Sequence, residues 1–262
     1  MNWQKRLAGW LQAGIPASGR LREVETDACL PVLWRTMAAM PQPVLAVLPS
    51  LATAEEAVAI LPDWAAAAGL DCPPLQLVPE VTTSGRFLPE QEAARARALH
   101  AASATADTWF LASAAGMLAP IPDPQQWTKL ARHLTPEMPC APAELARQLV
   151  AMDYDDELEA TTPGEFARRG GILDVFSPAH DLPVRIEFCG DTIASLRLFS
   201  PDDQRSRRPV DSYTIIARSE SGAGTLQPDS SFLDAFTARP AAVAIVHPSA
   251  CREHLTRFAD QA

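Results

Sequence analysis

Apolar and polar residues alternate with a period of two within residues 164–205, a pattern typical of β-strands that bury one face. In the most regular stretch, the apolar positions are Val184, Ile186 and Phe188, and the positions between them are Arg185, Glu187 and Cys189. We therefore predict a strand here, with its first set of side chains buried and its second set facing outward.

A turn signal at Gly190-Asp191 follows this strand, and the alternation then resumes. The expected inward residues of the second strand are Ala194, Leu196 and Leu198, and the expected outward residues are Ile193, Ser195 and Arg197. A three-residue connection, Gly190 to Thr192, matches these faces, whereas a two-residue loop would mix them. The chosen register places Arg185 directly opposite Arg197, and like charges so placed oppose folding by a few tenths of a kcal/mol. Either an external partner uses these arginines, or Glu187 neutralises them on a solvated face.

Two glycines, Gly170 and Gly171, separate the extended segments 165–169 and 172–176 as a bend or bulge would. Arg169 lies beside this bend, so Arg169, Arg185 and Arg197 are expected to share one face of a small antiparallel sheet. Arginine suits a recognition surface, because its planar guanidinium group binds carboxylates with two parallel hydrogen bonds.

The rest of the chain has a different pattern, in which short apolar runs alternate with helical segments. We predict strands at residues 44–48, 75–78 and 109–111, and helices at residues 27–40, 53–68 and 89–102. Pro31 must lie in the first turn of its helix, and Pro62 is expected to break or kink the second helix. Strands that alternate with helices imply a parallel sheet covered on both faces.

Three prolines, Pro120, Pro122 and Pro124, end this pattern, and we place a domain boundary there. Beyond it we expect a strand within 129–134, an amphipathic helix at 143–152 and the antiparallel sheet within 157–217. A helix from about Phe232, a strand at 241–247 and a helix after Pro248 return to the α/β pattern. The predicted fold is an α/β parallel-sheet domain (1–119 and 211–262) interrupted by an α+β insertion (120–210).

Composition limits the possible function classes. The chain has 262 residues, 47% of them hydrophobic, and a formal net charge of −10, which argues against a general nucleic-acid binder. Its five cysteines are widely spaced, and neither a secretory signal nor an apolar run long enough to span a bilayer is present in the sequence. We expect a reduced, cytoplasmic protein that does not bind a membrane.

The sequence lacks the lysine that a phosphate-binding loop requires. Gly14 and Gly19 have P-loop spacing, but Arg20 stands where the phosphate-binding lysine should be, and the only lysines in the sequence are Lys5 and Lys129. We therefore expect a degenerate nucleotide-binding architecture without catalytic residues, cofactor or metal.

A nuclease-like cluster of Asp174, Glu187 and Asp191 is interpreted as solvated strand and turn carboxylates. Cys189 is expected to be an ordinary thiol at the edge of the sheet.

Two ordered runs carry a family resemblance. GEFARRGGILDVF at 164–176 and RIEFCGDTIASLR at 185–197 resemble the domain 2 region shared by UvrB and the transcription-repair coupling factors. The segments LPVRIEF and LFSPDDQRS resemble the corresponding segments of the coupling factors. The two families differ in their P-loop, which is intact in UvrB and decayed in the UvrB-like module of the coupling factors. The missing lysine therefore makes this chain more similar to the coupling factors than to UvrB. The chain is thus similar to the N-terminal UvrB-like module (domains 1a, 2 and 1b) of a coupling factor.

The resemblance implies that this surface docks UvrA, the damage-scanning ATPase of nucleotide excision repair. Family members use two arginines and an aromatic residue, whose matching positions are Arg169, Arg185 and Cys189; Phe188 and Arg197 are further partner-binding candidates. Cys189 replaces the usual aromatic residue, which would weaken docking by about 1–3 kcal/mol. The chain is expected to be the N-terminal part of a longer ATP-dependent DNA translocase that binds RNA polymerase and double-stranded DNA. The alternatives are a UvrB-type nucleotide-dependent repair enzyme and a stand-alone homologue with another partner.

Overall fold

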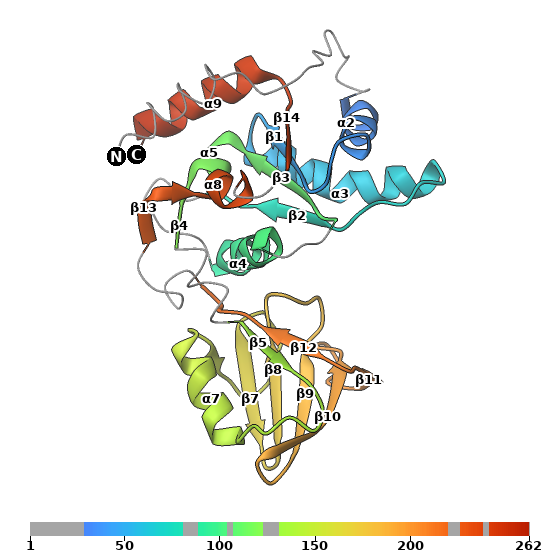
Figure 1. Cartoon of the computed structure of the whole chain (residues 1–262), viewed down its shortest axis with the longest axis vertical. Helices are drawn as coiled ribbons and strands as arrows, with labels where there is room; N and C mark the ends of the chain where they lie inside the picture. Colours follow the sequence, from blue (N-terminus) through green and yellow to red (C-terminus); the bar gives the residue numbers. More distant parts are fainter. Residues whose placement is uncertain are drawn as a thin grey trace. The chain divides into compact units, whose positions relative to one another are not determined.

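The structure, a computed structural model, describes residues 29–80, 89–103, 107–122, 131–219, 226–237 and 241–261. The chain forms two compact units, each composed of more than one segment (Figure 1). The first unit comprises Met1–Phe87, Ala104–Pro120 and Pro228–Ala262, and the second comprises Leu88–Ser103 and Ile121–Gln227. The domain boundaries inferred from the sequence, 119/120 and 210/211, stay a proposal.

The first unit is built on a parallel sheet of four strands in the order β14-β1-β3-β2. The strands are β1 (Val44–Leu48), β2 (Leu75–Val78), β3 (Trp109–Ser113) and β14 (Ala242–Ile245). All five residues of β1 and all five of β3 are buried, as expected for central strands of a sheet with both faces covered. The predicted α/β fold class is confirmed, and β1 and β2 have the predicted bounds.

The helices of this unit are α2 (Cys29–Ala38), α3 (Leu51–Ala67), α5 (Ala114–Leu118), α8 (Phe232–Thr237) and α9 (Pro248–Gln261). Helix α3 begins at a capping box formed by Ser50 and Thr53 and continues through Pro62. Of the two expected effects of Pro62, the break is therefore wrong, and the kink stays a prediction. Ala57, Leu61 and Ala65 on either side of Pro62 are all buried, so the packing of this helix face opposes a break.

Aromatic side chains fill the core on both faces of the parallel sheet. On one face, the Trp34 ring lies 5.7 Å from that of Trp64 and 5.9 Å from that of Trp109, centroid to centroid. On the other face, the Phe110 ring lies 5.6 Å from that of Phe232 and 5.4 Å from that of Phe236. Both faces are thus covered, as the alternation of strands and helices predicted.

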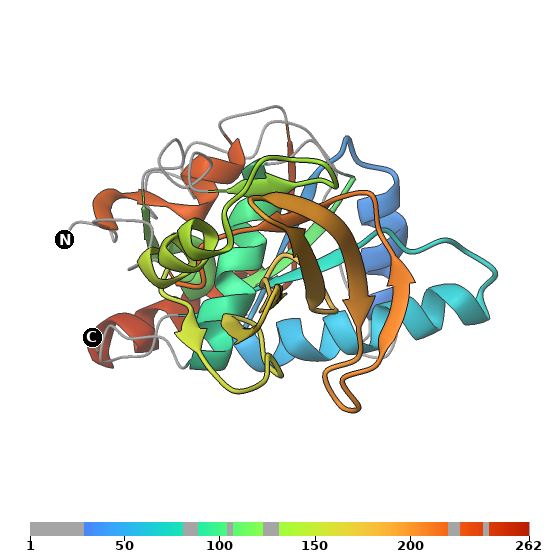
Figure 2. The ribbon, with the colours of Figure 1, turned by 90° about the horizontal axis from the view of Figure 1, so that it is seen from below.

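The second unit contains a six-stranded sheet in the order β11-β10-β9-β8-β7-β6. Its strands are β6 (Asp155–Asp156), β7 (Glu165–Arg169), β8 (Ile172–Phe176), β9 (Val184–Cys189), β10 (Thr192–Phe199) and β11 (Ser206–Pro209). Only β6 and β7 pair in parallel; the other neighbours are antiparallel. The strands are bent and twisted rather than flat (Figure 2).

Further elements complete this unit. They are α4 (Pro89–Ser103), α7 (Pro142–Ala151) and a two-stranded sheet of β5 (Arg132–Leu134) and β12 (Tyr213–Ile215). Two of the boundaries between the units fall within β4 (Pro120–Pro122) and β13 (Leu226–Ser231). Helix α4 is tied to the second unit by Arg97, whose guanidinium donates to the Pro178 carbonyl at 2.5 Å, the His180 carbonyl at 2.8 Å and the Asp181 carboxylate at 2.6 Å.

The β9–β10 hairpin has the predicted register at its arginines but not the predicted loop. Cys189 pairs with Thr192, so only Gly190 and Asp191 form the turn, and the expected three-residue connection is wrong. An irregularity between Ile193 and Ser195 then adds one residue, which makes Ile193 buried and Ala194 exposed, the reverse of the prediction. Beyond this bulge, the extra residue restores the expected alignment of the two strands.

Gly164 is placed where only glycine fits, immediately before β7. Its φ is +95°, and a Cβ atom would lie 2.5 Å from Cγ and Cδ of Arg218. Its N–H donates to the Phe176 carbonyl at 2.7 Å, which fixes the backbone in this conformation. The glycine therefore sets the point at which the chain enters the sheet.

We expect Gly164→Ala to lower the free energy of unfolding by about 1–3 kcal/mol, because the new methyl group adds both backbone strain and a collision. The measurement is chemical denaturation of the full chain. Gly171→Ala is the matched control, since its φ is not left-handed and the nearest atom to a new Cβ is 3.8 Å away. Equal stability of the two variants would contradict the assigned role of Gly164.

Candidate partner-binding site

The register of the six-stranded sheet brings the predicted arginines onto one face. Ala167 pairs with Asp174, Asp174 with Arg185, and Arg185 with Arg197, which makes one row across four strands. The neighbouring row runs from Arg169 through Ile172 and Glu187 to Ser195. We call this side of the sheet the arginine face and define it by Arg169, Asp174, Arg185, Glu187 and Arg197. The predicted pairing of Arg185 with Arg197 is confirmed.

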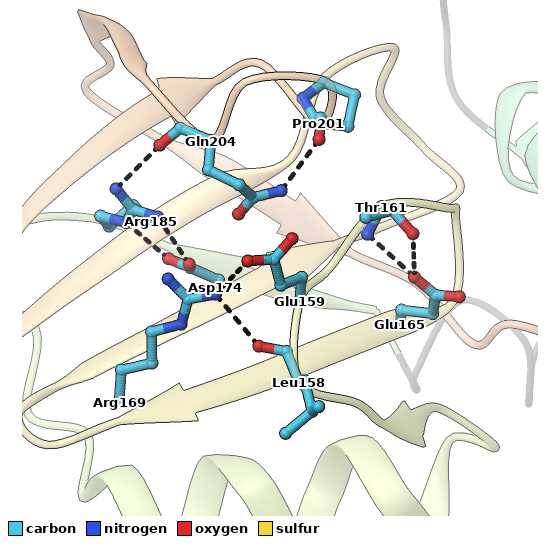
Figure 3. Close-up of polar contacts among 9 residues, drawn as sticks. All are labelled: Leu158, Glu159, Thr161, Glu165, Arg169, Asp174, Arg185, Pro201 and Gln204. Carbon is cyan, nitrogen blue, oxygen red and sulfur yellow. Dashed lines mark hydrogen bonds and ion pairs between the residues drawn. The ribbon is translucent and has the colours of Figure 1, made fainter.

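Arg185 is bound inside the unit rather than projecting from it (Figure 3). Its Nε and Nη2 donate to the two carboxylate oxygens of Asp174 at 2.8 and 2.7 Å, and its Nη1 donates to the Gln204 carbonyl at 3.3 Å. The guanidinium carbon lies 4.8 Å from the centroid of the Phe199 ring. The hydrogen bonds to Asp174 raise the pKa of Arg185 even though partial burial acts to lower it.

This arrangement corrects two expectations. Asp174 is fully buried and its partner Arg185 is only 17% exposed, so Asp174 is not the solvated carboxylate that the sequence indicated. The sequence also led us to expect Arg185 to be available to a partner. Its two hydrogen bonds to Asp174 occupy the planar edge that would otherwise bind a partner carboxylate. A partner that used this edge would have to displace a buried internal ion pair.

Arg169 lies at the surface, at the end of β7. Its Nη2 donates to the Leu158 carbonyl at 3.1 Å and to the Glu159 carboxylate at 3.0 Å (Figure 3). The side chains of Arg169 and Glu159 are 43% and 52% exposed. An ion pair this exposed contributes at most about 1 kcal/mol to stability, so a competing carboxylate can replace Glu159 at little cost.

The remaining predicted site residues, and Glu187 beside them, occupy different environments. Arg197 is partly buried, and its guanidinium makes no hydrogen bond or ion pair with the residues that the structure describes. Cys189 is exposed with a free thiol at the end of β9. Phe188 is partly buried on the opposite face, because strand residues alternate, and pairs with the buried Ile193. Glu187 accepts a hydrogen bond from the Ser195 hydroxyl at 2.7 Å.

The loop that follows β6 contains two residues that the sequence did not suggest for this site. Leu158 is 88% exposed, and Glu159 pairs with Arg169. The loop is fixed further on by Glu165, whose carboxylate accepts hydrogen bonds from the backbone and hydroxyl groups of Thr161 and Thr162. Burial acts to raise the pKa of Glu165, but these hydrogen bonds outweigh it and lower the pKa.

Other candidate chemistry can be placed only in part. Gly14, Gly19 and Arg20, on which the P-loop argument rests, lie outside the described residues, as does the side chain of Cys29. Among the residues that the structure describes, no three His, Cys, Asp or Glu side chains gather in a way that could hold a metal ion. Within the same ranges, no helix has the length and apolar character needed to cross a membrane.

The segment that contains the arginine face is similar to known proteins. Residues 133–220 match the family described as "UvrB interaction domain". A transcription-repair-coupling factor of Myxococcus xanthus is 53% identical over 62 residues, which are 24% of this chain and 5% of that protein. One from Mycobacterium tuberculosis is 56% identical over 54 residues, which are 21% of this chain and 4% of that protein. The UvrABC system protein B of Pasteurella multocida is 32% identical over 113 residues, covering 43% of this chain and 16% of that protein.

The chain therefore spans only a small part of the relatives that it matches. The predicted resemblance to the UvrB interaction domain and to the coupling factors is confirmed over this region.

We expect Arg185→Ala to lower the free energy of unfolding by about 3–5 kcal/mol, because it leaves the buried Asp174 carboxylate unpaired. Arg169→Ala, which removes an exposed ion pair, should cost less than about 1 kcal/mol. Chemical denaturation of both variants measures the difference. Asp174→Leu combined with Arg185→Met should recover most of the lost stability. Equal small losses in the two single variants would show that the Arg185–Asp174 pair is not an important internal contact.

Proposed function

We propose that this chain is a noncatalytic UvrB-like interaction module of a transcription-repair coupling factor. Its arginine face recruits UvrA to stalled RNA polymerase during nucleotide excision repair. The observation that carries the proposal is the exposed Arg169 on a sheet that lies within residues 133–220, the segment that matches the UvrB interaction domain. The full-length protein is proposed to be a cytoplasmic ATP-dependent DNA translocase that also binds RNA polymerase and double-stranded DNA.

The chemistry of the arginine face supports recognition of a protein partner. The two carboxylates of this face accept internal hydrogen bonds, Asp174 from Arg185 and Glu187 from Ser195, which leaves them poorly placed to act as an acid or base on a substrate. Arg169 presents a planar donor group at the surface, and this group matches a carboxylate of a partner.

The alternative of a UvrB-type nucleotide-dependent enzyme requires a phosphate-binding lysine. The sequence contains only Lys5 and Lys129, and neither follows a glycine-rich turn. A partner-binding role for the arginine face needs no such residue. We therefore assign the interaction role to the second unit and no nucleotide chemistry to the first.

Arg169→Ala is expected to weaken the binding of purified UvrA by about 10- to 100-fold, because it removes a charged contact to the partner. Titration of the full chain with UvrA by calorimetry or interferometry measures the affinity. Arg147→Ala on α7 is the control, since its side chain is 75% exposed and pairs only with Glu144 in the described structure. Its affinity should match that of the wild type. Unchanged affinity of a folded Arg169→Ala chain would count against the proposal.

Cys189→Phe is expected to tighten UvrA binding by about tenfold, because it restores an aromatic side chain at an exposed position where the resemblance places one. Cys189→Ser, which changes the polarity but adds no apolar area, should bind like the wild type. The same titration applies to both variants. Equal or weaker binding by the phenylalanine variant would place Cys189 outside the contact area.

A further inference from the structure

Leu158 is the most exposed large hydrophobic residue among those described, with 88% of its surface accessible. Ile60, Leu70 and Val150 follow at 41%, 38% and 59%. A single exposed leucine is common on protein surfaces and by itself indicates nothing. Leu158 differs because its backbone is fixed beside Arg169, the exposed arginine of the arginine face.

Contacts on both sides hold Leu158 in place. Before it, the Glu157 N–H donates to the Phe166 carbonyl of β7 at 2.8 Å. The Leu158 carbonyl itself accepts from Arg169 at 3.1 Å, as Figure 3 shows. After it, the side chain of Ala160 is fully buried in a cluster with Phe176 and Phe199. The loop is thus ordered, and binding a partner would cost little additional conformational entropy.

The residues around Leu158 indicate which chemical groups a complementary partner surface would need. The Arg169 guanidinium donates to the Leu158 backbone carbonyl, while the leucine side chain itself is exposed to solvent. The other partner of this guanidinium, Glu159, is exposed and easily replaced. A complementary surface has an apolar pocket bordered by a carboxylate. The pocket covers Leu158, and the carboxylate takes over the hydrogen bond to Arg169.

The distance to Cys189 is compatible with a single contact area. Arg169 on β7 and Cys189 on β9 are separated by one intervening strand and offset by two residues along it, which corresponds to about 12 Å at ordinary strand geometry. Both positions therefore fit within a standard protein interface of about 800 Å² per partner. Cys189 offers little apolar area within that surface, whereas Leu158 offers a complete aliphatic side chain.

We propose that Leu158 is the apolar anchor of the docking surface, and that it inserts into a pocket of the partner while Arg169 binds a carboxylate at its border. This inference rests on the proposed function and takes UvrA as the partner. It assigns to the loop after β6 the apolar contact that an aromatic residue at position 189 would otherwise provide.

The test measures UvrA affinity for the full chain with Leu158→Ala, Leu158→Met and Val150→Ala. We expect alanine at position 158 to weaken binding by about tenfold or more, methionine to keep wild-type affinity, and the Val150 variant to change it by less than about twofold. Because Leu158 and Val150 are exposed at 88% and 59%, all three variants should unfold at the wild-type temperature.

The possible outcomes separate the two proposals. Wild-type affinity for Leu158→Ala, in a chain that binds UvrA, would overturn the role of Leu158 and leave the proposed function intact. Equal weakening by alanine and methionine would overturn it as well, because an apolar anchor tolerates a side chain of similar volume. A wild-type chain with no measurable affinity for UvrA would overturn the proposed function and, with it, this inference.

Discussion

The hydrogen-bonded ion pair between Arg185 and Asp174 organises the arginine face. It joins β8 to β9, and through the Gln204 carbonyl it also fixes the loop after β10. A carboxylate that is completely buried is tolerated only when it is paired, so the position of Asp174 dictates where the Arg185 guanidinium must lie. The pair therefore shapes the surface on which Arg169 remains available to a partner.

Local sequence patterns predicted most of the fold. The glycine pair at 170–171 gave the bounds of β7 and β8, and the strand–helix order gave the parallel sheet. The pattern did not determine the path of the β9–β10 turn, because a three-residue loop and a two-residue turn followed by a bulge give the same register at Arg185 and Arg197. The continuity of α3 through Pro62 also depends on packing against the sheet rather than on local propensity.

The candidate site was predicted less completely than the fold. The period of two correctly placed the arginines on one face, but it carries no information on which of them is paired internally. That difference depends on Phe199 and on a loop that brings Glu159 next to Arg169, contacts between residues distant in sequence. Leu158 was missed because it stands alone in an acidic run, where polarity indicates only a loop.

A hydrogen-exchange footprint of the full chain with saturating UvrA tests most directly whether the arginine face is the docking surface. Backbone amides in the loop after β6, at the β7–β8 turn and at the β9–β10 turn should exchange more slowly in the complex, because an interface excludes water from all three segments. Amides of α7 and of the parallel sheet should exchange as in the free chain. Protection confined to those latter elements, with the arginine face unchanged, would contradict the account.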